Sequence, residues 1–116
     1  MDKISSNQMS DYTTEQLSFT NNTETVFTTE ASNAWEGQDL YVVYSCEEHF
    51  PMYVYDHQSE LWFGNSDKYS PTTSRFQTIA CPEVDQINMI TTDLLNQIIN
   101  CGGFIHYYSD RCGVLI

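Results

Sequence analysis

Hydrophobic and polar residues alternate most clearly between residues 39 and 65. The segments 39–45, 52–56 and 60–65 are rich in β-branched and aromatic residues and are separated by short polar stretches. Alternation with a period of two is typical of β-strands. Because the connections are short, the pattern predicts three strands in an antiparallel meander. The segment 75–81, which ends before Pro82, is predicted as a fourth strand.

The period becomes helical near residue 90. Four apolar residues recur at the spacing of one helix face, namely Leu94, Leu95, Ile98 and Ile99. Thr91 or Thr92 is a suitable N-cap, and Gly102 with Gly103 is a suitable left-handed stop. The sequence therefore predicts an α+β fold, in which a small curved antiparallel β-sheet carries one principal α-helix near residues 91–101.

Residues 1–34 differ from the rest of the chain in composition and in the spacing of their apolar residues. They are polar and acidic, rich in Ser, Thr, Asn and Gln, and their apolar residues show no sustained period. Such a composition predicts a segment that is partly mobile or arm-like, with a short strand near residues 23–28. Residues 35–116 are predicted to form a single α+β domain.

The charge balance narrows the choice of partners. Sixteen Asp and Glu residues face only four Lys and Arg residues, which gives a formal net charge of −12. A negative field repels nucleic acid and anionic membranes and attracts basic protein surfaces. No apolar run approaches the length of a membrane span, and residues 1–16 contain no apolar leader. We therefore expect a cytosolic protein with reduced thiols, and no direct binding to nucleic acid or membrane.

Candidate catalytic and metal-binding patterns are weak. The residues that a metal or thiol site would use are Cys46, His49, Cys101, His106 and Cys112. Their spacing lacks the paired C-x-x-C pattern of structural zinc sites. Glu47 and Glu48 directly follow Cys46 and would raise the pKa of its thiol, which disfavours a nucleophile. We expect no catalytic residue, no metal and no cofactor, and keep a small metal or thiol protein as an alternative.

Aromatic residues indicate a protein-binding surface. Tyr and Trp contribute strongly to protein interfaces, and here they alternate along the predicted strands among acidic residues. The predicted partner-binding residues are Glu47, Glu48, Tyr53, Tyr55, Asp56, Glu60 and Trp62. In the alternative interpretation the rings fill the core of a small β-sheet.

Part of the chain resembles a module found in small bacteriophage proteins. Residues 44–56 read YSCEEHFPMYVYD, residues 62–70 read WFGNSDKYS and residues 72–74 read TTS. They are similar to the pattern Y-S-Y-G-x-H-F-P-M-Y-V-Y-D, W-x-G-N-x-D-K-Y-S and T-T-S of that module. The resemblance covers residues 40–82. The chain departs from the pattern where Cys46 and Glu47 replace Tyr and Gly, and where Cys81 stands in place of an arginine.

The resemblance implies a counter-defence role and no catalytic residue. Small acidic phage proteins of this kind include vibriophage inhibitors of the BREX antiphage system. We therefore expect a protein of the host cytoplasm that inhibits a BREX-type system by binding one of its components, an ATPase in our hypothesis. An acidic dimer that mimics DNA is an alternative, although the carboxylates are dispersed. We also expect a homodimer, because a small aromatic sheet with an apolar chain end leaves edges to cover.

Overall fold

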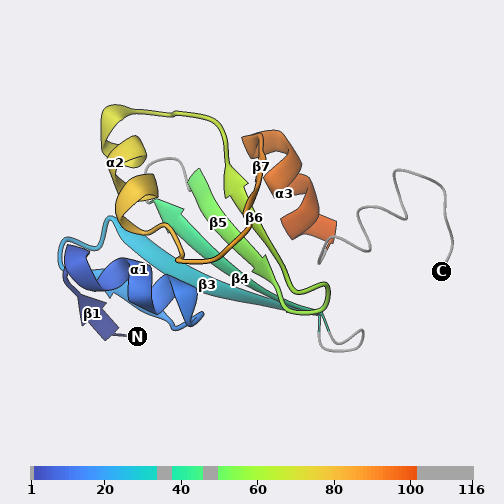
Figure 1. The fold of residues 1–116 in the computed structure, drawn as a ribbon, viewed down its shortest axis with the longest axis horizontal. Helices are drawn as coiled ribbons and strands as arrows, with labels where there is room; N and C mark the ends of the chain where they lie inside the picture. The colour runs from blue at the N-terminus through green and yellow to red at the C-terminus, as the bar shows by residue number, and fades with distance from the viewer. Residues whose placement is uncertain (1, 34–37, 46–49, 102–116) are drawn as a thin grey trace, which may run out of the picture.

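The computed structural model describes residues 2–33, 38–45 and 50–101 of the 116-residue chain (Figure 1). This part of the chain forms seven strands and three helices. In chain order they are β1 (Asp2–Ile4), α1 (Ser6–Thr14), β2 (Phe19–Asn21), β3 (Val26–Asn33), β4 (Gln38–Ser45), β5 (Phe50–Asp56), β6 (Leu61–Asn65), α2 (Pro71–Ile79), β7 (Asn88–Ile90) and α3 (Thr92–Cys101). None of these helices is long and apolar enough to cross a membrane.

The described strands lie in one sheet, and their order across the sheet matches their order along the chain. The pairs from β2 to β6 are antiparallel, whereas β1 with β2 and β6 with β7 are parallel. The α+β class is confirmed, but the prediction of a purely antiparallel sheet is wrong at both ends. A parallel pair requires a crossover connection. Helix α1 lies in one crossover and α2 in the other.

Strands β4, β5 and β6 form the predicted meander, with one irregularity. Val43 pairs with Tyr53 and Tyr44 pairs with Pro51, so Met52 is the extra residue of a β-bulge. Met52 and Tyr53 consequently pack in the same core cluster. Strict alternation would place these two neighbours on opposite faces, and the bulge interrupts that alternation.

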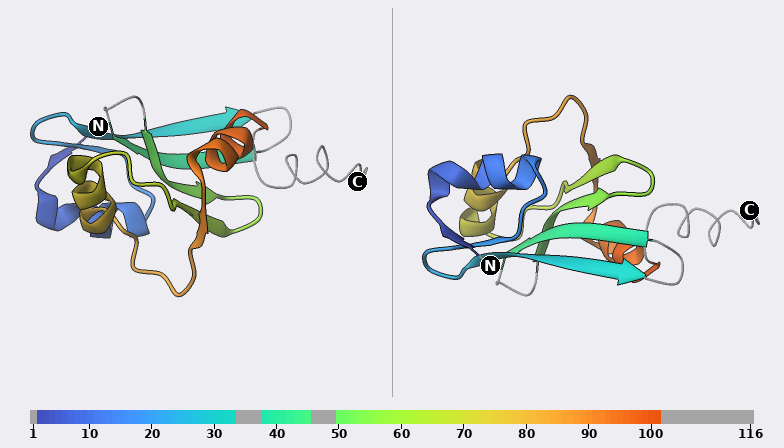
Figure 2. Two further views of the ribbon diagram at one scale, coloured as in Figure 1. Left: turned by 90° about the horizontal axis from the view of Figure 1, so that it is seen from above. Right: turned by 90° about the horizontal axis from the view of Figure 1, so that it is seen from below.

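Helices cover both faces of the sheet. Helices α1 and α2 lie side by side on one face (Figure 2), where Met9 of α1 packs in one cluster with Tyr41 and Trp62 of the strands. Helix α3 covers the other face, where Leu95 and Ile98 pack against residues of β4, β5 and β6. A strand that is covered on both sides buries both of its alternating sets of side chains. This arrangement leaves little of β5 and β6 exposed.

Residues 2–33 contribute to the sheet and to one of the helices that cover it. The segment expected to be arm-like contributes β1, α1, β2 and β3, and β3 pairs with β4 along its whole length. Helix α1 begins after Ser5, whose backbone N–H donates to Gln8 Oε1 at 3.1 Å. This contact is half of a capping box, a signal that is also readable in the sequence.

Helix α2 replaces the fourth strand predicted for residues 75–81, so that prediction is wrong. Ser70 caps the helix, since its Oγ accepts a hydrogen bond from the backbone N–H of Thr73 at 3.1 Å. Pro71 occupies the first helical position, where its missing N–H costs nothing. Helix α3 confirms the helix predicted near residues 91–101. Thr91 is its N-cap, with Oγ1 accepting from the backbone N–H of Leu94 at 3.3 Å.

Candidate binding site

The strand residues that were predicted to face a partner are mostly covered. Tyr53 and Trp62 are only 5% and 6% exposed, and Asp56 is fully buried. Tyr55 is half-buried, and its ring lies against that of Trp62 with centroids 5.0 Å apart. Helices α1 and α2 cover the sheet face that carries these rings. Tyr53, Asp56 and Trp62 are therefore almost entirely buried, and the alternative in which the rings fill the core describes Tyr53 and Trp62.

The acidic candidates differ in position. Asp56 Oδ1 accepts a hydrogen bond from the backbone N–H of Gln58 at 3.0 Å, which fixes the turn between β5 and β6. Glu60, in the same turn, is exposed and has a left-handed backbone with φ of 57°. Glu47 and Glu48 lie outside the described residues, so their role in partner binding stays a prediction.

Among the described residues of the segment that carries the sequence resemblance, the longest exposed run is the loop after β6. Residues 66–69 are all exposed. Asn65, which is fully buried, holds this loop in place. Its Nδ2 donates to the carbonyl of Pro51 at 2.8 Å and to Thr92 Oγ1 at 2.9 Å, and its Oδ1 accepts from the backbone N–H of Asp67 at 2.8 Å. The side chain thus joins β5, the loop and α3.

Helices α2 and α3 support the same loop. Gln77 Nε2 donates to the carbonyls of Asn65 at 2.9 Å and Asp67 at 3.2 Å. Asp67 Oδ2 accepts from the backbone N–H of Thr92 at 2.9 Å. This hydrogen bond, with a smaller contribution from the Thr92 side chain, lowers the pKa of the Asp67 carboxyl. The loop therefore presents an ionised carboxylate beside the first turn of α3.

A hollow of about 300 Å³ opens between this loop, the start of β5 and α3. The rings of Phe50 and Tyr69 lie together in its wall, with centroids 5.8 Å apart and planes tilted by 36°. We call it the aromatic hollow. It is lined by Phe50, Pro51, Asp67, Lys68, Tyr69, Thr92 and Asn96. Its volume is at the low end for ligand pockets, which suits one long side chain better than a cofactor.

A second hollow of about 370 Å³ lies on the other side of Lys68. We call it the cysteine hollow. It is lined by Tyr53, Lys68, Gln77, Thr78 and Cys81. The Tyr53 hydroxyl donates to the Gln77 carbonyl, and burial together with the neighbouring Cys81 thiol raises the pKa of Tyr53. Gln77 Oε1 is buried and has no hydrogen-bond partner within the described part of the chain.

The metal and thiol alternative gains nothing from the described residues. In residues 2–33, 38–45 and 50–101, no three His, Cys, Asp or Glu side chains are placed to hold a metal ion. Cys81 is a half-buried free thiol, and Cys101, the last residue of α3, is also half-buried. The other residues of that alternative lie outside the described residues, namely Cys46, His49, His106 and Cys112.

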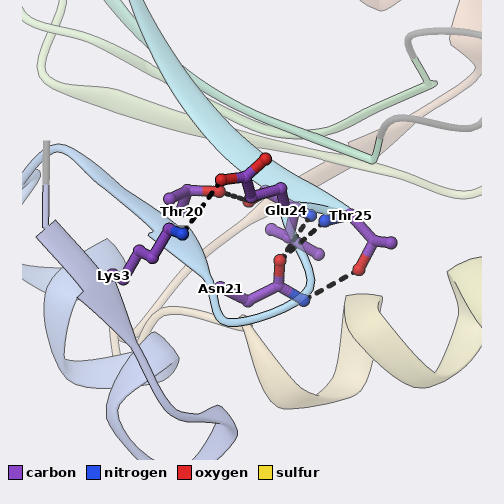
Figure 3. A network of polar contacts seen from close by, with 6 residues as sticks. Lys3, Thr20, Asn21, Glu24 and Thr25 are labelled. Atoms are coloured by element: carbon purple, nitrogen blue, oxygen red, sulfur yellow. Dashed lines mark hydrogen bonds and ion pairs between the residues drawn. The ribbon is translucent and has the colours of Figure 1, made fainter.

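Acidic side chains dominate the described surface. Among the Asp and Glu side chains that the structure describes, all are exposed except Asp56. An ion pair of 3.1 Å joins Lys3 Nζ to Glu24 where the β2–β3 turn lies beside β1 (Figure 3). Asn21 stabilises that turn, since its Oδ1 accepts from the backbone N–H of Thr25 at 2.7 Å. Lys3, which takes part in this ion pair, is one of the four Lys and Arg residues of the chain.

None of the residues that line the aromatic hollow is among the predicted partner-binding residues. A usable signal was present, because residues 62–70 belong to the segment that resembles the phage module and include Lys68, one of only four Lys and Arg residues. Asn96 carries no comparable signal, since it is one polar residue on a helix. A scan against protein-family models and searches of curated proteins and of solved structures find no match to this chain.

Proposed function

We propose that this chain is a small acidic binding protein that docks on another protein and has no catalytic role. The observation that carries the proposal is the exposed loop of residues 66–69, which Asn65 and Gln77 hold from beneath. A loop that is ordered before binding loses little conformational entropy when a partner arrives. The net charge of −12 adds long-range attraction toward a basic partner surface.

The resemblance to the phage module suggests a specific system and target for the proposed binding. We propose a phage-encoded counter-defence protein that acts in the host cytoplasm and inhibits a BREX-type system by binding a component, with the ATPase as the first target to test. Proteins that handle DNA carry basic faces. An acidic protein associates quickly with such a face and competes with DNA for it.

We also propose that the chain forms a homodimer. Met89 lies on β7, at the edge of the described sheet, and is 52% exposed. Exposed apolar residues on an edge strand favour pairing with another chain. Sedimentation velocity at micromolar concentration tests this proposal. A single monomeric species across the concentration range would refute it.

Affinity capture tests the docking proposal. Tagged protein is incubated with lysate of a bacterium that carries a BREX-type defence island, washed at moderate salt and analysed by mass spectrometry. We expect stoichiometric recovery of one defence subunit. Tyr69→Ala should reduce the recovery, because Tyr69 is 49% exposed on the loop. Leu17→Ala is the matched control, since Leu17 is 48% exposed elsewhere on the surface.

Two outcomes would contradict the proposal. One is recovery of no defence subunit. The other is recovery of many basic proteins that all leave as salt rises, since screening removes generic attraction between exposed charges. Substituting the exposed acids one at a time separates a specific interface from DNA mimicry. A specific interface predicts a few dominant residues, whereas mimicry predicts a small loss at every acid.

A further inference from the structure

The aromatic hollow has the chemistry of a site for a guanidinium group. We infer that it binds an arginine side chain of the partner protein. This inference rests on the proposed function, because it names the group by which the docked partner is recognised. The three observations that carry it are an accessible aromatic ring, an exposed carboxylate, and the negative field of the molecule.

The aromatic ring is provided by Tyr69. Its side chain is 49% exposed, so part of the ring is accessible to a ligand. Phe50, which is only 5% exposed, lies behind it with ring centroids 5.8 Å apart. A guanidinium group is planar, weakly hydrated and attracted to the faces of aromatic rings. The Phe50 contact holds the Tyr69 ring as one wall of the hollow.

The hydrogen-bond acceptors lie on the other walls. Asp67 Oδ2 accepts from the backbone N–H of Thr92, and the Thr92 hydroxyl also interacts with this carboxylate. Asp67 is exposed, and a carboxylate can accept about four hydrogen bonds, so a guanidinium N–H can donate to it while the contact with α3 remains. The carboxamide of the exposed Asn96 lines the same hollow and offers a second acceptor oxygen. Arginine has five N–H donors in a planar fork, which suits acceptors placed around one hollow.

Charge and size favour arginine over other ligands. An anion would meet Asp67 inside the hollow and a molecule of net charge −12 around it. A lysine ammonium is more strongly hydrated and stacks less well on a ring. A volume of about 300 Å³ suits a single long side chain. Lys68 also lines the hollow, but its side chain is exposed and long enough to keep its ammonium in water.

A peptide titration followed by NMR tests the inference on the full chain. The probe is acetyl-Gly-Arg-Gly-amide, added to ¹⁵N-labelled protein to millimolar concentration. We expect saturable shifts at the backbone amides of Asp67, Tyr69, Thr92 and Asn96. The same peptide with lysine should bind more weakly. The peptide with citrulline, which keeps the shape of arginine and lacks its charge, should give no saturable shift.

A pair of charge variants separates the hollow from the general field. Asp67→Asn keeps an acceptor for the Thr92 N–H and removes the charge, so the arginine peptide should bind roughly three- to fivefold more weakly. Asp93→Asn removes the same charge from the first turn of α3, and Asp93 does not line the hollow. The affinity of the Asp93→Asn variant for the arginine peptide should stay within about a factor of two of that of the unmodified chain. Equal losses in both variants, or no saturable shift with the unmodified chain, would overturn the inference.

The two proposals fail in different ways. Suppose the unmodified chain captures a defence subunit and Asp67→Asn captures the same amount. The arginine site is then wrong, while the docking function stands. Suppose instead that the arginine peptide gives saturable, Asp67-dependent shifts and no defence subunit is captured. The site then stands, and the proposed target is wrong.

Discussion

Asn65→Ala should destabilise the fold strongly, because one buried side chain makes several of the contacts that hold the loop. The substitution removes the hydrogen bonds to the Pro51 carbonyl, to Thr92 Oγ1 and to the Asp67 N–H. A hydrogen bond within a protein contributes about 1 kcal/mol net, and a buried partner left unpaired costs more. Three such bonds predict a loss of about 3 to 4 kcal/mol in the free energy of unfolding.

Urea unfolding followed by circular dichroism and tryptophan fluorescence measures this loss. Asn88→Ala is the matched control, because the Asn88 side chain donates one hydrogen bond, to the Trp62 carbonyl at 3.0 Å. It should cost about 1 kcal/mol. If Asn65→Ala costs no more than Asn88→Ala, the reasoning is refuted. If Asn65→Ala does not fold, Thr92→Val, which removes the hydroxyl that contacts Asn65 and Asp67 and keeps the Thr92 N–H, should cost about 1 to 2 kcal/mol.

Three further predictions concern the surroundings of the loop. Ser70→Ala removes the side-chain cap of α2, in which Ser70 Oγ accepts from the backbone N–H of Thr73 at 3.1 Å, and should cost about 1 kcal/mol in the same urea assay. An unchanged urea midpoint would contradict the cap. Gly64→Ala places a methyl group 2.7 Å from Met89 Sδ and 3.0 Å from Ile87 Cγ2. Because the exposed Met89 side chain can turn outward and Ile87 has to shift only slightly, the cost should be about 1 to 2 kcal/mol, whereas a loss above about 3 kcal/mol would show that these side chains are held in place. The lowered pKa of Asp67 means that its contribution to stability is present above the pKa of the unfolded chain and is lost as pH falls through the lower folded pKa. Thermal midpoints measured from about pH 6 to about pH 3 should therefore fall less for Asp67→Asn than for the unmodified chain, and parallel curves would argue against this effect.

The central strands and the last helix were predictable because their patterns are long and local. The alternation in β4, β5 and β6 and the apolar stripe of α3 each extend over a full element. Helix α2 was missed because residues 72–79 contain several β-branched side chains, which favour strands. The better signal was Ser70 followed by Pro71, a cap followed by the preferred first residue of a helix. Strands β1, β2 and β7 have three residues each, too few to show a period.

The position of the site depended on the two missed helices. Tyr53 and Trp62 are of residue types that are common in interfaces. If α3 were the only helix, the sheet face that carries them would be exposed. Helices α1 and α2 bury that face, so the longest exposed run among the described residues of the segment is the loop after β6. The residues next to Tyr53 in the sequence do not indicate that it is covered by α1, a helix about 40 residues earlier in the chain. Burial here is a tertiary property, and alternation alone cannot distinguish a covered face from an open one.

The order of the strands also has a consequence for how the chain folds. Every described strand pairs with the strand beside it in the sequence, so the antiparallel pairs close short loops and the two parallel pairs close longer crossovers that contain α1 and α2. The entropy lost on closing a loop grows with its length, and proteins with mostly local contacts fold quickly. We expect the hairpins around β4 to form first, with β1 and β7 adding last at the two edges. No segment has to pass between strands that are already paired, so this sheet can grow from its middle outward while the chain is still being synthesised.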